Sequence, residues 1–218
     1  MRRAIFIGIL LLLAAAGGMA IGRARSNAGF FSQPGSFDYL LRLLLVLAVY
    51  MCLTIWLGAR PRPRLLPFPR IVLIAGVVGG MLEIAGILVE NLLPTLRVLP
   101  IAVELAMFLS WAGVGALASR WGDSIRAGIV TSVAAAALCM VIGVCGGEIV
   151  EFFVHPAPAS EVATWGEYLR SDWSDAAAFQ IANTMDSATT HLVVAPFVAL
   201  VLGSSGAALG SVRKKSNC

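Results

Sequence analysis

Six apolar runs, most of them about 20 residues long, constrain this chain more than any other feature of its sequence. Hydrocarbon cannot hydrogen-bond an exposed backbone, so a segment that crosses a membrane must be a helix or part of a closed barrel. The runs do not alternate between polar and apolar residues, and their length suits helices rather than barrel strands. The sequence therefore predicts an all-α, polytopic transmembrane helical bundle.

The composition agrees with this class of protein. Of the 218 residues, 59% are hydrophobic and only 13% are charged, whereas soluble domains carry roughly 25% charged residues. We expect a single transmembrane domain over residues 1–218, with the lipid bilayer as its partner. The net charge is +4, but the basic residues form short clusters beside apolar runs. That placement argues against nucleic acid as a partner, because membrane proteins fix their orientation in this way.

The apolar runs set the predicted spans, which lie at about 4–22, 39–59, 70–93, 98–118, 127–154 and 183–210. The first run follows two arginines and ends in small residues near Ala20, so a cleaved signal peptide over residues 1–20 is an alternative to a first span. We favour the uncleaved span. The longest connection, residues 155–182, contains Trp165, Leu169 and Trp173 at helical spacing and predicts a short helix on the membrane surface.

The basic residues predict the orientation of the spans. Arg and Lys are enriched in the cytoplasmic segments of membrane proteins. With the amino terminus inside, most of the 16 basic residues fall on the inner side: Arg2, Arg3, Arg60, Arg62, Arg64, Arg70, Arg120, Arg126, Arg213, Lys214 and Lys215. We therefore predict a multi-pass protein of the inner (plasma) membrane, with both termini cytoplasmic and the 155–182 loop outside.

Acidic residues and histidines gather at one predicted depth. A helix rises about 1.5 Å per residue, so the predicted topology puts polar groups of four spans in the half of the membrane next to the outer face. Charged groups are costly there and mark functional sites by default. The residues concerned are Glu83 and Glu90, Glu104, Glu148, Glu151 and His155, and Asp186 and His191.

Helical spacing predicts which faces these groups share. Glu148, Glu151 and His155 are spaced i, i+3, i+7 and fall within roughly 60° of one another on a regular helix. The same spacing recurs at Asn183, Asp186 and Thr190. A polar stripe facing lipid would be very unfavourable, so we expect both stripes to point inward and to line an outward-facing polar pocket.

Carboxylates and imidazole in such a pocket suggest two ligands. They are good ligands for a divalent metal ion, and the predicted metal ligands are Glu148, Glu151, His155, Asp186, Glu83 and Glu90. Without metal, crowded carboxyl groups would hold protons, which suits proton-coupled transport. A hydrogen-bond network that ties helices together is the structural alternative.

Two other function classes remain open beside transport of a metal cation or proton. In an intramembrane enzyme, Glu148, Glu151 and Asp186 would be the catalytic candidates, acting as general acids or bases on a lipid or isoprenoid substrate. In an accessory subunit, the polar stripes would meet a membrane-protein partner or another copy of the chain. The sequence does not decide whether the protein is an enzyme.

The last third of the chain resembles a known family. The stretch "GEIVEF", then a loop, then "NTMDSATTHLVVAPFVALVLG" is similar to the carboxyl-terminal half of the YjdF-type bacterial inner-membrane proteins. The resemblance places Glu148 and Glu151 on the family's paired glutamates and Asp186 on its first aspartate, with Thr190 where the pattern has a second aspartate. It implies a six-helix inner-membrane protein and no particular activity.

Overall fold

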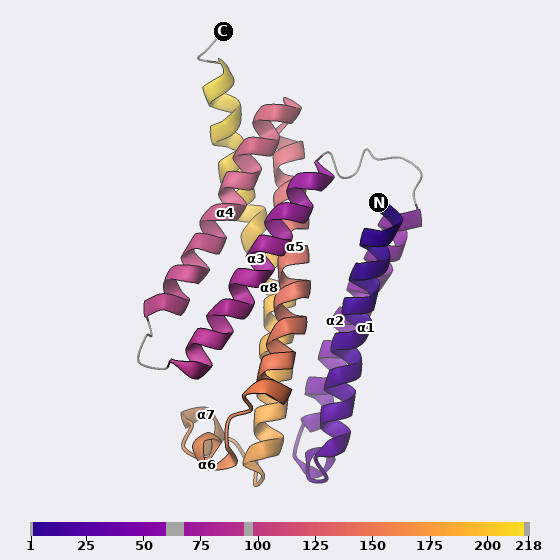
Figure 1. Cartoon of the computed structure of the whole chain (residues 1–218), viewed down its shortest axis with the longest axis vertical. Helices are drawn as coiled ribbons and strands as arrows, with labels where there is room; N and C mark the ends of the chain where they lie inside the picture. Colours follow the sequence, from indigo (N-terminus) through magenta and orange to yellow (C-terminus); the bar gives the residue numbers. More distant parts are fainter. Residues whose placement is uncertain (1, 60–67, 94–97, 216–218) are drawn as a thin grey trace. The chain divides into compact units, whose positions relative to one another are not determined.

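A computed structural model describes residues 2–59, 68–93 and 98–215, with side chains for residues 4–59, 68–93 and 98–212. Every regular element within these residues is a helix (Figure 1). The long helices are α1 (Arg2–Ser26), α2 (Ser36–Ala59), α3 (Pro69–Leu92), α4 (Val98–Gly122), α5 (Ile125–Ile149) and α8 (Ala176–Lys215). The short ones are η1 (Phe30–Ser32), the π-helical turn η3 (Val150–Val154), α6 (Ala159–Val162) and α7 (Gly166–Leu169).

The predicted all-α class and the six spans are confirmed. Six helices are long and apolar enough to cross a membrane: Ala4–Ser26, Ser36–Ala59, Pro69–Leu92, Val98–Gly122, Ile125–Val154 and Ala176–Val212. Several basic residues that predict the orientation lie outside the described residues or have no described side chain: Arg2, Arg3, Arg60, Arg62, Arg64, Arg213, Lys214 and Lys215. The predicted orientation therefore stays a prediction.

The chain divides into two compact units. Unit 1 comprises Met1–Ile55 and Val144–His191, and unit 2 comprises Trp56–Gly143 and Leu192–Cys218. Helices α5 and α8 each contribute one part to each unit. Each unit is described below by itself.

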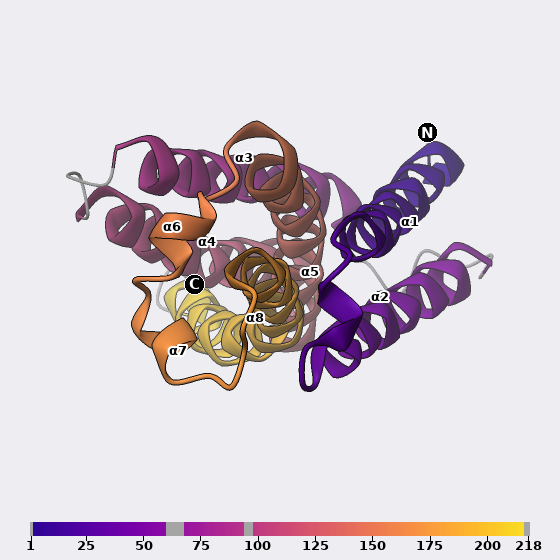
Figure 2. The ribbon, with the colours of Figure 1, turned by 90° about the horizontal axis from the view of Figure 1, so that it is seen from below.

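In unit 1, α1 and α2 lie side by side (Figures 1 and 2). The buried face of α1 is made largely of small residues, with Ala16, Ala20 and Ala24 almost fully buried. A side chain at Gly17 would lie 3.5 Å from Leu44 and 3.6 Å from Leu47 of α2. Small residues at helical spacing let membrane helices approach closely, which explains why this apolar helix packs along its alanine face.

Aromatic rings from η1, α2 and the connection before α8 contact one another in unit 1. Trp173 contacts three rings edge-on, with centroids 6.3 Å from Phe30, 6.1 Å from Tyr39 and 5.8 Å from Phe179. The predicted surface helix from Trp165 to Trp173 does not form along its whole length: only the single turn α7, Gly166–Leu169, is helical within it. Trp173 lies beyond that turn, in the cluster of rings.

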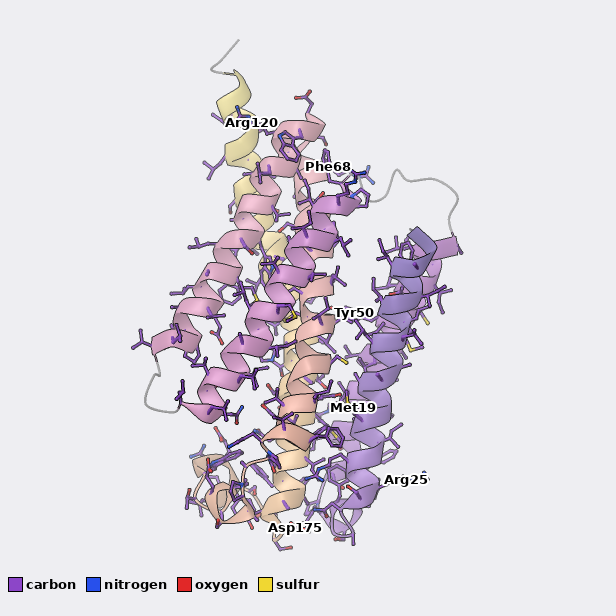
Figure 3. The ribbon with its side chains drawn as sticks, viewed as in Figure 1. Met19, Arg25, Tyr50, Phe68, Arg120 and Asp175 are labelled. Carbon is purple, nitrogen blue, oxygen red and sulfur yellow. The ribbon has the colours of Figure 1, made fainter. Side chains whose placement is uncertain are left out.

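Polar contacts hold the same part of unit 1. The Gln33 side chain accepts a hydrogen bond from the Ser174 backbone N–H at 2.9 Å. Asp175 begins α8, because its Oδ1 accepts hydrogen bonds from the N–H groups of Ala177 and Ala178 at 2.9 and 3.1 Å. Asp175 and Arg25 at the end of α1 both lie in this part (Figure 3). Helix α8 therefore starts at Ala176, earlier than the predicted start at 183, and the preceding connection is shorter than predicted.

In unit 2, glycines bring helices into backbone contact. A Cβ added at Gly80 of α3 would lie 2.9 Å from the Cys139 backbone carbonyl oxygen of α5. On α8, a Cβ at Gly206 would collide with the Ala112 carbonyl of α4. The Ser119 hydroxyl of α4 also donates to the Ala207 carbonyl of α8 at 2.9 Å. Close approach of this kind maximises van der Waals contact between helices in lipid, where the hydrophobic effect no longer drives their association.

The contact at Gly206 predicts a stability difference between two glycine substitutions. Gly206→Ala should lower the free energy of unfolding by about 1–3 kcal/mol, because the added methyl group meets backbone that can move only with its helix. Gly113→Ala is the matched control within unit 2, since a Cβ there has no neighbour within 4 Å. Thermal unfolding in detergent, followed by tryptophan fluorescence, measures both. Equal unfolding midpoints for the two variants would contradict the packing described for α4 and α8.

Candidate functional site

Glu148 is the most deeply buried acidic side chain in the described part of the chain. It lies in the last turn of α5, within unit 1, and is 1% exposed. Neither of its carboxyl oxygens has a hydrogen-bond partner among the described residues. Val144, Cys145 and Val150, its neighbours along the helix, are buried as well. A polar group removed from water without a partner costs free energy, so this position needs a chemical explanation.

Glu151 lies one turn further along and is half-buried. Its Oε2 accepts a hydrogen bond of 2.5 Å from the hydroxyl of Thr184 on α8, which is 5% exposed. Glu148 and Glu151 are three residues apart, so their side chains leave neighbouring positions on the same side of the helix. The two glutamates therefore form a pair at the end of α5, and the Thr184 hydroxyl fixes the orientation of the Glu151 carboxyl.

The helix changes form at this pair. Residues Val150–Val154 form a π-helical turn, closed by a hydrogen bond of 2.8 Å from the His155 N–H to the Val150 carbonyl. A π turn holds more residues than an α turn, so the face predicted from regular helical spacing does not continue through it. His155 lies at the end of this turn and is exposed. Turns of this kind within α-helices occur frequently at functional sites.

Gln180 and Thr184 are the buried polar residues of α8 in unit 1, and sequence reasoning missed both. With its amide oriented to satisfy both partners, Gln180 accepts a hydrogen bond from the Ala157 N–H at 2.8 Å and donates to the Ala157 carbonyl at 3.2 Å. The two side chains are four residues apart and thus share one face of the helix. That spacing was the available signal, but the predicted helix began after Gln180.

The predicted inward face of α8 is wrong. Asn183 and Thr190 are exposed, and Asp186 is half-buried with no hydrogen bond to another described residue in the structure. The buried face is formed by small and apolar residues, among them Ala182 and Met185. Close packing, rather than the polarity of one stripe, decides which face of this helix is buried. The imidazole of His191, also exposed, lies 2.9 Å from the carbonyl of Ser187 in its own helix.

Glu83 and Glu90 of α3 belong to unit 2, as does Glu104 of α4. Glu83 is half-buried and packs against α5, where a Cβ at Gly143 would lie 2.7 Å from its Cγ. Glu90 and Glu104 are exposed.

In unit 1, the exposed Arg42 lies 5.8 Å from the ring centroid of Tyr39 on the same helix. Of the predicted ligands, the structure brings together Glu148 and Glu151, and His155 is exposed at the end of the π-helical turn that follows them.

The described residues contain no group of three His, Cys, Asp or Glu side chains that could hold a metal ion. The predicted metal site, with its six predicted ligands, is not supported by this arrangement and stays a prediction. What the geometry of unit 1 provides is a pair of carboxyl groups, one fully buried and one held by a threonine hydroxyl.

The fold and its six apolar helices are those of an integral, multi-pass membrane protein of the helical class. No protein-family model, curated protein or solved structure matches the chain. The functional argument therefore has to proceed from the residues of unit 1 themselves.

The Thr184 hydroxyl gives a stability prediction for this site. Thr184→Val keeps the shape of the side chain but removes the donor to Glu151, and should lower the free energy of unfolding by about 1 kcal/mol. Thr184→Ser retains a hydroxyl and should recover part of that loss. Thr190→Val, at an exposed position of the same helix, is the matched control and should change little. Chemical unfolding in mixed micelles measures the differences, and equal effects of Thr184→Val and Thr190→Val would contradict the assigned contact.

Proposed function

We propose that this protein is a proton-coupled membrane transporter whose proton-binding site is the Glu148–Glu151 pair. The observation that carries the proposal is the position of Glu148, 1% exposed and without a partner for either carboxyl oxygen among the described residues. An ionised carboxylate in that position would be a buried, uncompensated charge, which costs far more than a buried neutral group. The surroundings of Glu148 therefore favour the protonated acid.

The neighbouring glutamate supports a proton rather than a metal ion as the ligand. Glu151 already accepts a hydrogen bond from Thr184, and two neighbouring carboxylates on one helix repel each other when both are charged. A divalent ion needs several protein oxygens or imidazoles around it. A single proton shared by the pair needs only the two carboxyl groups that unit 1 brings together.

The location of the pair supports transport. Both glutamates lie within the span Ile125–Val154. Ionisable residues inside membrane-spanning helices are rare, and they mark ion pathways and proton relays. The distribution of Arg and Lys in the sequence favours an inner (plasma) membrane protein whose 155–175 segment faces outward. In that orientation the pair lies near the outer end of its span.

Proton flux through reconstituted protein tests this proposal. The purified protein is reconstituted into liposomes that enclose a pH-sensitive dye. A pH gradient is imposed across the liposome membrane, and its decay is followed in the presence of each of a series of inorganic cations. The wild-type protein should dissipate the gradient faster than empty liposomes with at least one of these cations. Glu148→Gln should reduce the rate to that of empty liposomes, because the amide keeps the shape of the acid but cannot carry a proton.

Glu161→Gln is the control variant, since Glu161 is an exposed carboxyl in α6 and lies outside the pair. Its flux should match the wild type. If the wild-type and Glu148→Gln proteins dissipate the gradient at the same rate with every cation, the proposed transport role is contradicted.

A further inference from the structure

We propose that protons reach Glu148 from the end of unit 1 that carries residues 155–175, and that Glu151 relays them. Thr184 acts as the positioning residue of the relay. This inference rests on the proposed proton-binding role of Glu148. It adds a direction of access and two further residues, which proton binding alone does not require.

The first observation is a gradient of exposure along one helix. Glu148 is 1% exposed, Glu151 is half-buried and His155 is exposed. These are successive ionisable groups, each about one helical turn from the last. A proton from water at the His155 end thus meets a carboxyl that solvent can reach before it meets the carboxyl that solvent cannot reach.

The second observation is that α5 itself carries no further carboxyl or imidazole group in the opposite direction. Between Arg126 and Glu148, α5 carries no Asp, Glu, His, Lys or Arg. Its two hydroxyl groups there, on Thr131 and Ser132, donate to the backbone carbonyls of Ala127 and Trp111 at 2.7 and 2.8 Å. The thiols of this stretch, Cys139 and Cys145, are buried, and Glu83 of α3 packs against it at Gly143 within unit 2. The helix itself therefore offers no solvent-accessible carboxyl or imidazole in this direction.

The third observation is the Thr184 hydrogen bond. At 2.5 Å, the Thr184 hydroxyl holds Oε2 of Glu151 against α8 in the region where the π-helical turn begins. The carboxyl is therefore fixed in one orientation while remaining half-exposed. A relay group has to be positioned in this way, because proton transfer is efficient only at hydrogen-bond reach or through one water.

The other charged side chains of unit 1 do not replace Glu151 in this role. Those of the spanning helices are Arg23 and Arg25 on α1, Asp38 and Arg42 on α2, and Asp186 on α8. None of them forms an ion pair or hydrogen bond with Glu148 in the described part of the chain. The Nε of Arg23 is itself buried without a partner. Glu151 is therefore the charged group best placed to exchange a proton with Glu148.

The proposed step conserves protons and changes no oxidation state. A proton from water binds the ionised carboxylate of Glu151 and forms its neutral acid. That O–H bond then breaks as the proton passes to the ionised carboxylate of Glu148, directly or through one water. Glu151 returns to its carboxylate form, and the Thr184 hydroxyl keeps its own proton throughout. Release from Glu148 follows the same path in reverse.

Infrared spectroscopy of the purified protein in detergent follows this exchange. The C=O stretch of a protonated carboxylic acid shifts when its proton is replaced by deuterium, so a rapid change from H₂O to D₂O buffer gives an exchange rate. We expect a Glu148 band in the wild type that is absent from Glu148→Gln. Glu151→Gln should leave the band at similar intensity but slow its shift by roughly a hundredfold, the usual scale for loss of a positioned acid–base group.

Companion variants separate relaying from folding. Thr184→Val should slow the shift less than Glu151→Gln does, while Thr184→Ser, which keeps the donor, should approach the wild-type rate. Glu161→Gln removes an exposed carboxyl of α6 and should exchange as the wild type does. A merely structural role for Glu151 and Thr184 would change the thermal unfolding midpoint without this ordering of the rates.

The outcomes distinguish the two proposals. If the wild type has no band that Glu148→Gln removes, Glu148 does not hold a proton and the proposed function fails together with the relay. If the band is present but shifts at the same rate in Glu151→Gln as in the wild type, the relay is wrong while proton binding by Glu148 stands. If the band is present in the wild type and in Glu151→Gln, and exchanges slowly only in Glu151→Gln, both the proton-binding role and the relay are supported.

Discussion

A carboxyl group buried in a membrane-spanning helix without a hydrogen-bond partner is the constraint on which this account depends. Hydrocarbon and packed apolar side chains offer no compensation for a charge, and from this we propose that Glu148 is neutral or shares a proton with Glu151. Three features of unit 1 accompany it. Glu151 lies one turn away, Thr184 orients it, and the helix widens into a π turn before it ends at His155.

Small residues provide the scaffold for this arrangement, separately in each unit. In unit 1 the alanines of α1 form its buried face, and in unit 2 glycines bring α4 and α8 into backbone contact. Interhelical hydrogen bonds from Ser119 and Ser132 to backbone carbonyls add direction to these contacts.

The sequence predicted the spans well, because length and hydropathy alone decide whether a helix can cross a membrane. It also predicted Glu148 and Glu151 as neighbours, because residues three positions apart lie on the same side of a helix. It failed where the outcome depends on packing or on a local change of helix. The face of α8 was predicted from polarity, but small residues decide which face is buried. The π turn, and with it the place of His155, breaks the regular periodicity that the prediction assumed.

Thr184 and Gln180 were missed for a related reason. The start of α8 is set by Asp175, whose side chain caps the first turn, and the prediction placed the helix start later. An Asp followed by three alanines is an ordinary helix start, so this signal was present in the sequence. Their partners could not be inferred, because a contact between residues 151 and 184 requires the packing of two helices.

The protonation state of Glu148 in the intact protein is the most direct test of the central claim. A hydrophobic carbodiimide forms a stable N-acylurea with carboxylic acids that are protonated and lie in apolar surroundings, and mass spectrometry locates the product. The account predicts that, at neutral pH, Glu148 is the main labelled residue, that labelling declines as the pH is raised, and that it disappears in Glu148→Gln. Labelling that is absent from Glu148 at neutral pH, while exposed carboxyls such as Glu161 react equally in both proteins, would contradict it.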